Sequence, residues 1–158
     1  MPMSPPASGE TLLVHATAVA IGGAGVLLTG RPGSGKSDLA LRLVDGGASL
    51  IADDQVMLRR DGDRLIAAFP DAAPAELRGR LEVRGLGLMP VAPSAAVPLV
   101  LVVLLRPGPP AERLPVPQSA EYLGVAVPLL GLDPFTASAA AQVRLAVLTP
   151  GRGIIPPQ

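Results

Sequence analysis

The segment that most constrains this chain is residues 30–37, which match the pattern G-x-x-x-x-G-K-[ST] in full. Its residues are Gly30, Arg31, Pro32, Gly33, Ser34, Gly35, Lys36 and Ser37. Glycines allow the backbone to form a tight loop whose N–H groups point inward, and such a loop binds nucleotide phosphates. We expect the whole segment to form the nucleotide site, with Lys36 reaching the β- and γ-phosphates and Ser37 ligating Mg²⁺.

The flanking sequence predicts a strand, a loop and a helix in the order that this motif requires. The apolar run at residues 26–29 is typical of a buried strand. After the loop, apolar residues recur at the spacing of one helix face, namely Leu39, Ala40, Leu43 and Val44. The glycine pair at residues 46–47 is expected to end this helix. A glycine-rich turn that binds no phosphate is the alternative, and the flanking pattern argues against it.

Composition excludes several classes of function. Of the 158 residues 49% are hydrophobic, which suits one domain with a buried core. The formal net charge is zero, aromatic residues make up 2%, and no lysine or arginine block occurs, so we expect no nucleic-acid partner. The absence of cysteine excludes disulfides and thiolate catalysis. We find no signal peptide and no apolar stretch long enough to span a bilayer, so we expect a cytoplasmic protein without membrane contact.

The order of the predicted elements suggests the fold. We expect residues 11–150 to form a single domain, with a flexible tail at residues 1–10 and another at residues 151–158. A strand–loop–helix unit within an otherwise strand-rich chain indicates an α/β fold. We therefore expect a mixed β-sheet of the P-loop kinase type, flanked by few helices. The site should lie at the carboxyl ends of the strands 26–29 and 50–52.

Three further elements are predicted from local signals. Residues 97–105 form an apolar run that is expected to be a central strand. Asp61 and Gly62 lie between two apolar runs, which predicts a hairpin. Asp133 followed by Pro134 predicts a helix start, with the helix continuing to about Leu148.

Two adjacent carboxylates, Asp53 and Asp54, follow the apolar strand and supply a second part of the site. A carboxylate at this position can complete the shell of a bound Mg²⁺, usually through water. Neighbouring side chains point to opposite faces if the chain stays extended, so one carboxylate can serve the metal while the other takes a proton from an incoming hydroxyl. The alternative is a pair of solvated aspartates at a turn.

His15, Glu82 and Arg84 are the remaining candidates. His15 is the only histidine and is expected on the strand that pairs with residues 26–29, which would place it near the loop. A lone histidine of this kind is also compatible with a structural or exposed position. Alternation along residues 81–84 places Glu82 and Arg84 on one face of a strand, and the following glycines predict a tight turn. A solvated Glu–Arg pair is the alternative.

Taken together, these residues resemble the catalytic domain of HPr kinase/phosphorylase. The resemblance is carried by His15, the loop at residues 30–37, the sequence Ile-Ala-Asp-Asp at residues 51–54 and the sequence Leu-Glu-Val-Arg-Gly-Leu-Gly at residues 81–87. It is strong over residues 12–90 and weak in the last third of the chain. The pattern looks like the short, single-domain form found in alphaproteobacteria.

The resemblance implies a bacterial serine kinase that uses ATP and Mg²⁺. Its substrate would be HPr, a phosphocarrier protein of the sugar phosphotransferase system, with a regulatory role in carbon and nitrogen metabolism. It also implies a reverse step, in which inorganic phosphate attacks phosphoserine and pyrophosphate forms, and a homo-oligomer, which is a hexamer in the family.

Roles for individual residues follow from the same resemblance. Asp54 would be the catalytic base with His15 assisting it, and Lys36 would stabilise the transferring phosphoryl group. Ser37 and Glu82 would hold the metal, and we add Asp53 to that set.

One departure from the family pattern concerns the reverse step. Near residues 127–130 the pattern carries an active-site arginine, and this chain has leucine. Arg84 and Arg152 are candidate substitutes. Two other functions stay open, a P-loop enzyme that is a small-molecule kinase or an ATPase, and a nucleotide sensor without turnover. Loss of transfer in Asp54→Asn would separate the kinase from the sensor.

Overall fold

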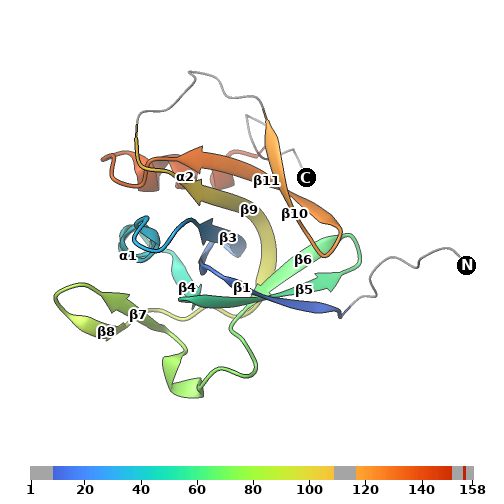
Figure 1. Cartoon of the computed structure of the whole chain (residues 1–158), viewed down its shortest axis with the longest axis horizontal. Coiled ribbons are helices and arrows are strands. Elements are labelled where there is room, and N and C mark those ends of the chain that lie inside the picture. Colours follow the sequence, from blue (N-terminus) through green and yellow to red (C-terminus); the bar gives the residue numbers. More distant parts are fainter. Residues whose placement is uncertain (1–8, 109–116, 151–154, 156–158) are drawn as a thin grey trace, which may run out of the picture.

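The structure, a computed structural model, describes residues 9–108, 117–150 and 155. Within them the α/β prediction is confirmed, because a curved mixed sheet carries two helices (Figure 1). Residues 1–8, 151–154 and 156–158, which make up most of the two expected tails, lie outside the described residues, so the domain limits stay a prediction. None of the described helices is long and apolar enough to cross a membrane.

Most of the described elements are short strands, and few helices occur among them. The strands of the main sheet are β1 (Thr11–His15), β2 (Thr17–Ile21), β3 (Ala24–Thr29), β4 (Ser49–Ala52), β5 (Gln55–Asp61), β6 (Arg64–Ala68), β9 (Val97–Leu105), β10 (Gln118–Tyr122) and β11 (Val125–Leu132). A separate two-stranded sheet consists of β7 (Arg80–Val83) and β8 (Gly87–Pro90). The helices are α1 (Lys36–Asp45), α2 (Ala139–Leu148) and the short 3₁₀ turn η1 (Ala75–Leu77).

The apolar strand β9 lies in the middle of the sheet, as its sequence predicts. The order of strands is β1-β5-β6-β9-β3-β2-β4, and β9 pairs in parallel with both β3 and β11. Its first residues, Val97 and Pro98, pair instead with β6 in the antiparallel sense. One long strand therefore joins the hairpin β5–β6 to the strands that lead into the site, and Figure 1 shows it curving between them.

The direction of β2 decides where the site forms. β2 pairs antiparallel with β3 on one side and with β4 on the other, so β3 and β4 run in the same direction. The carboxyl ends of β3 and β4 and the amino end of β2 consequently meet at one edge of the sheet. The phosphate loop follows β3 and Asp53 follows β4, so both segments lie at the strand ends at which the sequence predicts them.

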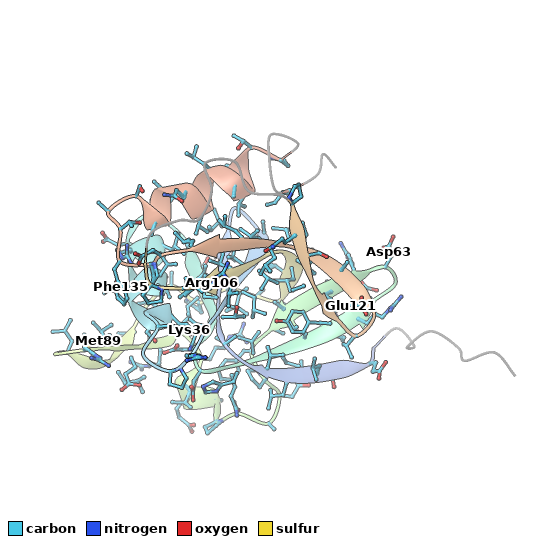
Figure 2. All side chains as sticks on the ribbon, turned by 45° about the horizontal axis from the view of Figure 1, so that its top comes forward. Lys36, Asp63, Met89, Arg106, Glu121 and Phe135 are labelled. Atoms are coloured by element: carbon cyan, nitrogen blue, oxygen red, sulfur yellow. The ribbon has the colours of Figure 1, made fainter. Side chains whose placement is uncertain are left out.

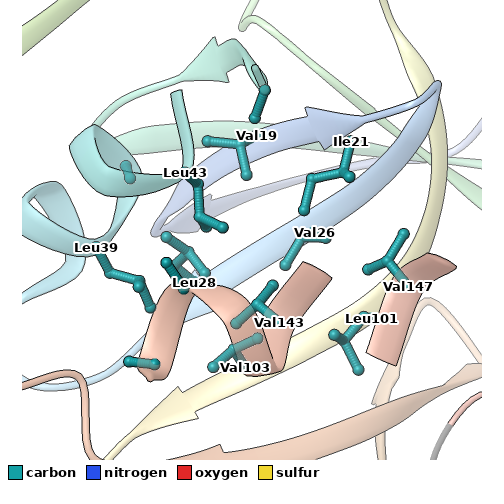
Figure 3. Packing of buried hydrophobic residues seen from close by; sticks show 14 of the residues in the cluster. Val19, Ile21, Val26, Leu28, Leu39, Leu43, Leu101, Val103, Val143 and Val147 are labelled. Atoms are coloured by element: carbon teal, nitrogen blue, oxygen red, sulfur yellow. The ribbon is translucent and has the colours of Figure 1, made fainter. Parts of the chain in front are cut away.

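Two hydrophobic cores lie on the two faces of this sheet because side chains alternate along each strand. On β3, Val26 and Leu28 belong to the cluster under the helices, and Leu27 belongs to the cluster on the other face. Figure 3 shows the first cluster, in which Leu39 and Leu43 of α1 pack with residues of β3 and β9. Burying a side chain of this size stabilises the fold by about 1.5–3 kcal/mol relative to leaving it exposed. The two helices are thereby held against the sheet face beside the site.

The predicted end of α1 is confirmed, and the predicted start of α2 is wrong. Gly46 is the C-cap of α1, and Gly47 has a φ of 110°, a left-handed conformation that glycine adopts without strain. Helix α2 begins at Ala139 after Ser138, five residues beyond Pro134. The carboxylate of Asp133 accepts a hydrogen bond from the backbone N–H of Phe135 at 2.9 Å, and this local bond forms a turn in place of a helix start.

Two hairpins agree with their glycine signals. Strands β5 and β6 pair up to Asp61 and Arg64, with Gly62 at a φ of 66° in the turn, as Asp-Gly predicts. The turn after β7 contains Gly85 at a φ of 86°. The β7–β8 hairpin forms an arm that projects from the sheet next to α1 (Figure 1).

Candidate active site

The phosphate loop connects β3 to α1, and its glycines have conformations that other residues strain to adopt. Gly35 has a φ of 102° and is the N-cap of α1. Gly30 has a φ of 152°, and a Cβ atom there would lie 2.5 Å from the Oγ of Ser34. The loop therefore needs glycine at both positions, which is the physical content of the sequence pattern.

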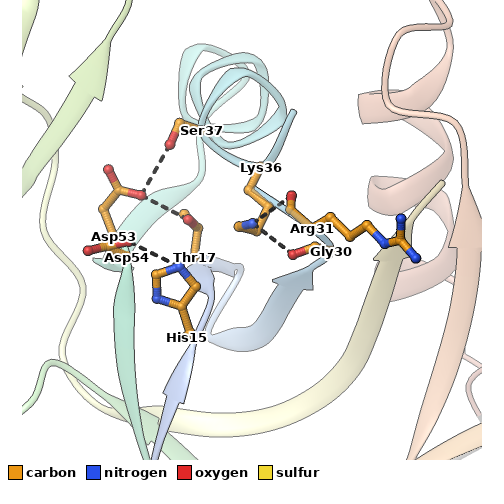
Figure 4. Close-up of polar contacts among 8 residues, drawn as sticks. All are labelled: His15, Thr17, Gly30, Arg31, Lys36, Ser37, Asp53 and Asp54. Atoms are coloured by element: carbon orange, nitrogen blue, oxygen red, sulfur yellow. Dashed lines mark hydrogen bonds and ion pairs between the residues drawn. The ribbon is translucent and has the colours of Figure 1, made fainter. Parts of the chain in front are cut away.

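Lys36 lies inside the curve of this loop. Its ammonium donates hydrogen bonds to the carbonyl oxygens of Gly30 at 2.9 Å and Arg31 at 3.2 Å (Figure 4). The Oγ of Ser34 is buried and has no hydrogen-bond partner among the described residues. An unpaired buried hydroxyl, an ammonium and a helix N-terminus together suit a bound phosphate, which would accept hydrogen bonds from all three. The side chain of Arg31 extends away from this group, so only its backbone is part of the loop (Figure 4).

Asp53 is the residue on which the separate elements converge. Its Oδ1 accepts hydrogen bonds from the hydroxyl of Thr17 at 2.8 Å and from the hydroxyl of Ser37 at 3.3 Å (Figure 4). Its Oδ2 accepts one from the backbone N–H of Glu82 at 3.2 Å. These donors belong to β2, α1 and β7, so the half-buried carboxylate joins the phosphate loop to the β7–β8 arm.

Asp54 points away from Asp53 and toward His15 (Figure 4). Its Oδ1 lies 3.5 Å from the Nε2 of His15, and the side chains of Asp54 and His15 are 78% and 61% exposed. The two carboxylates diverge as expected, although the chain is not extended here. Strand β4 ends at Ala52, and Asp54 has a φ of 73°, in the left-handed region that aspartate tolerates better than most residues.

The expected location of His15 on the strand paired with β3 is wrong. The extended segment breaks at Ala16, whose N–H donates to the carbonyl oxygen of Asp54 at 3.1 Å. His15 therefore ends β1, which pairs with β5, and only the following strand β2 pairs with β3. The break places the imidazole beside Asp54.

Glu82 and Arg84 line a pocket of about 520 Å³ at the loop. The pocket is lined by Gly33, Gly35, Lys36, Ser37, Asp38, Leu41, Glu82, Val83, Arg84 and Phe135. Along β7 Leu81 is buried and Glu82 is exposed, as the predicted alternation requires, whereas Arg84, also exposed, lies one residue beyond the end of the strand. Arg152, the other candidate cation, lies outside the described residues. Leu129 and Leu130 of β11, in the segment near which the resemblance leads one to expect an arginine, pack against the hydrophobic cores.

The donors near the loop suit Mg²⁺ only in part. The Ser37 hydroxyl and the Asp53 carboxylate are oxygen ligands, which Mg²⁺ prefers, and they lie 3.3 Å apart. Among the described residues no group of three or more histidine, aspartate or glutamate side chains could hold a metal. Such an ion would need phosphate oxygens and water to complete its shell, which is the usual way in which proteins bind Mg²⁺ at phosphates.

Sequence reasoning missed Thr17 and Phe135. Thr17 is 1% exposed and donates to Asp53, but only the strand order reveals that the first residue of β2 lies at the edge of the site. Phe135 lines the pocket from a segment more than ninety residues beyond the loop. Neither residue belongs to a motif, so no local signal identifies them.

Comparison with known proteins places this geometry in a family. The family model described as HPr Serine kinase C-terminal domain matches residues 8–95. The HPr kinase/phosphorylase of Exiguobacterium sp. is 45% identical over 78 residues, which are 49% of this chain and 24% of that protein. The HPr kinase/phosphorylase of Bacillus mycoides is 46% identical over 82 residues, which are 51% of this chain and 25% of that protein. The matched segment thus spans about a quarter of the length of these relatives.

A solved structure extends the similarity beyond the matched sequence. The structure titled Hpr(Ser) kinase/phosphatase from Coxiella burnetii superposes with a TM-score of 0.72 at 25% sequence identity. The superposition covers 87% of this chain and 94% of that chain. This share is larger than residues 8–95, so the likeness in fold includes part of the chain that the family model leaves unmatched.

Proposed function

The chain belongs to the HPr serine kinase C-terminal domain family, and we propose that it is an ATP- and Mg²⁺-dependent protein kinase that phosphorylates a serine of the phosphocarrier HPr. The observation that carries this proposal is that two adjacent carboxylates have different partners and different surroundings. Asp53 accepts a hydrogen bond from Ser37 at the phosphate loop, and Asp54 faces His15 at a solvent-exposed position. A phosphoryl transfer to a hydroxyl needs one carboxylate for the metal and one for the proton.

In this proposal the loop at residues 30–37 binds the nucleotide. Backbone N–H groups of residues 30–37 and the Lys36 ammonium would hold the phosphates, and the N-terminus of α1 adds its partial positive charge. Ser37 and Asp53 would hold Mg²⁺, and Glu82 lines the same pocket. The metal, when bound, neutralises charge that builds up on the phosphate oxygens.

The transfer step uses the second carboxylate. Asp54 accepts the proton of the substrate serine hydroxyl while the serine oxygen forms its bond to the γ-phosphorus. The bond between that phosphorus and the bridging oxygen breaks, and ADP leaves. His15, 3.5 Å from the Oδ1 of Asp54, orients the carboxylate for this step. The roles of the site residues stay a proposal that rests on this geometry and on the family.

The exposure of Asp54 favours a protein acceptor over a small molecule. A side chain that is 78% exposed is not enclosed by its own chain, so the acceptor has to bring the surface that excludes water from the reacting groups. A folded protein such as HPr provides that surface. We place the reaction in the cytoplasm, where ATP and HPr are present, and we propose a regulatory role in carbon and nitrogen metabolism on the same basis.

Phosphorolysis, the reverse step, would need a cation beside the phosphates. Leu129 and Leu130 pack against the cores, so they bring no cation to the phosphates. Arg84 lines the pocket and is the described residue that can take this role. Inorganic phosphate added to phosphorylated HPr in the absence of ATP should reveal whether pyrophosphate forms.

The kinase proposal is tested by the intact mass of HPr after incubation with the chain, ATP and Mg²⁺. We expect a gain of one phosphoryl group, located on serine by fragmentation, and no gain when Mg²⁺ is chelated. An unchanged mass, with ATP binding demonstrated separately, would reject HPr as the substrate. The small-molecule and sensor alternatives would then be favoured.

The buried hydroxyl of Thr17 provides a finer test of the metal site. Thr17→Val keeps the shape of the side chain and removes the 2.8 Å hydrogen bond to Asp53. We expect the Mg²⁺ concentration for half-maximal activity to rise about 10–100-fold, as is typical when the partner of a metal ligand is lost. Titration of activity with Mg²⁺ measures this change.

Thr29→Val is the matched control, because it also removes one partly buried hydrogen bond, from Thr29 to the carbonyl oxygen of Val103 at 2.9 Å. Both variants should lower the free energy of unfolding by about 1 kcal/mol. Only Thr17→Val should shift the Mg²⁺ midpoint. Equal shifts in the two variants would mean that lost stability, and not the orientation of Asp53, causes the effect.

A further inference from the structure

Phe135 is an exposed aromatic ring at the phosphate loop that the proposed chemistry does not use. It is one of two phenylalanines in the chain and is 61% exposed. It nevertheless lines the same pocket as Gly33, Gly35 and Lys36. Figure 2 shows Phe135 and Lys36 on the same side of the molecule. What distinguishes Phe135 from the other exposed apolar side chains is therefore its place at the pocket and not its exposure.

The segment that carries Phe135 is held from two sides. The carboxylate of Asp133 accepts the backbone N–H of Phe135 at 2.9 Å and that of Gly108, which follows β9, at 3.1 Å. The guanidinium of Arg42 on α1 donates to the carbonyl oxygens of Pro134 and Thr136. The backbone on either side of Phe135 is therefore tied to both the helix and the sheet.

The topology brings the segment of Phe135 to the same end of the sheet as the phosphate loop. The segment follows β11, which runs parallel to β9, and β9 runs parallel to β3. The carboxyl ends of β3, β9 and β11 thus share one edge of the sheet. Phe135 follows β11, the second strand from β3, and its ring approaches the loop at Gly35. A Cβ atom at Gly35 would lie 3.3 Å from two atoms of the ring, so the glycine allows the ring to approach the loop.

The pocket combines charged or polar lining residues with apolar ones. Lys36, Ser37 and Glu82 suit phosphates and a metal, as argued above. Phe135 and Leu41, which is partly buried on α1, supply the apolar surface. A nucleoside triphosphate has the same combination, since its phosphates are charged and its base presents a flat π-face. Base–aromatic stacking is tolerant of the kind of base because every base has such a face.

We propose that Phe135 is the platform on which the base of the bound nucleoside triphosphate stacks, with Leu41 extending the apolar surface. This inference rests on the proposed use of ATP at the loop. The low aromatic content of the chain does not oppose it, because one ring is sufficient for one base. Phe135 would contribute to the affinity for the nucleotide and not to the transfer step.

The test compares ATP with tripolyphosphate, which carries the same phosphates without a base. Dissociation constants for both ligands, with Mg²⁺, would be measured by calorimetry on the full chain and on Phe135→Ala. We expect the variant to bind ATP about tenfold more weakly or worse and tripolyphosphate with unchanged affinity. Phe135→Tyr keeps the ring and should restore the ATP affinity. Leu148→Ala, which removes an equally exposed apolar side chain on α2, should bind both ligands as the unmodified chain does.

Each other result rejects the inference. An unchanged affinity of Phe135→Ala for ATP would show that the base binds elsewhere. An equal loss for ATP and tripolyphosphate would show that the ring only supports the fold of the loop. If the unmodified chain binds tripolyphosphate and ATP equally well, the phosphate site stands and the platform is rejected. If it binds neither, the proposed function fails together with this inference.

Discussion

Replacing Asp54 with asparagine should lower the rate of phosphoryl transfer to HPr by about 10²–10⁴-fold, which is the usual contribution of a general base. The amide has the size of the carboxylate but cannot accept the serine proton. The backbone should not be disturbed, because Asp54 has a φ of 73° and asparagine tolerates this left-handed conformation as well as aspartate does. Single-turnover rates from the mass of HPr would measure the loss, and nucleotide titration should show unchanged ATP binding.

Asp63→Asn is the matched control for this substitution. Asp63 is exposed in the β5–β6 turn, on the far side of the molecule from Lys36 (Figure 2). The same loss of one carboxylate there should leave the transfer rate unchanged. A fully active Asp54→Asn would mean that another group accepts the proton. Equal inactivity of the unmodified chain and of Asp54→Asn, with ATP bound by both, would instead support a nucleotide sensor.

The parts of the site that the sequence predicts are those encoded by consecutive residues. The loop at residues 30–37 needs glycines at fixed positions, and Gly30 and Gly35 have the conformations that explain them. The pair Asp53 and Asp54 follows a strand that can be recognised by its own apolar residues. Local steric rules therefore suffice to predict these elements, and their place at the strand ends is confirmed.

The contacts between elements could not be predicted in the same way. Thr17 reaches Asp53 because β2 runs antiparallel between β3 and β4, and nothing near Thr17 in the sequence reports that strand order. His15 ends β1 and does not belong to β2, because the chain breaks at Ala16, and this break involves a hydrogen bond to the distant residue Asp54. These arrangements depend on how strands that are distant in the sequence pair with one another. Local sequence patterns carry no information on that pairing.

Asp133 and Pro134 show how a correct local signal can lead to a wrong element. Aspartate followed by proline is favoured both at helix starts and in turns. Here the Asp133 carboxylate accepts the N–H of Phe135 and that of Gly108, a residue 25 positions earlier. The tertiary partner favours the turn, and the helix begins at Ala139. Phe135 consequently lies in a turn, from which it lines the pocket.

Lys36→Met should have the second large effect, a fall in kcat/KM of about 10³-fold or more, because the ammonium contacts both the bound phosphates and the charge of the transition state. The carbonyl oxygens of Gly30 and Arg31 also lose their donor, so the free energy of unfolding should fall by about 1–2 kcal/mol. Thermal unfolding would separate this loss from the kinetic one. Arg64→Met on β6 removes an exposed cation that is paired with Asp61. It should change neither kcat/KM nor the free energy of unfolding by a comparable amount.

Lys36 also allows a test without any substitution, because it is the only lysine among the 158 residues. An amine-acylating reagent can therefore modify two groups, the Lys36 ammonium and the α-amino group. Bound ATP should cover Lys36 and slow its acylation, while the α-amino group reacts at its own rate and serves as a reference within the same molecule. Peptide mass spectrometry would measure both rates. If saturating ATP with Mg²⁺ leaves the ratio of the two rates unchanged, the loop does not hold the phosphates at Lys36, and the proposed chemistry at this site is rejected.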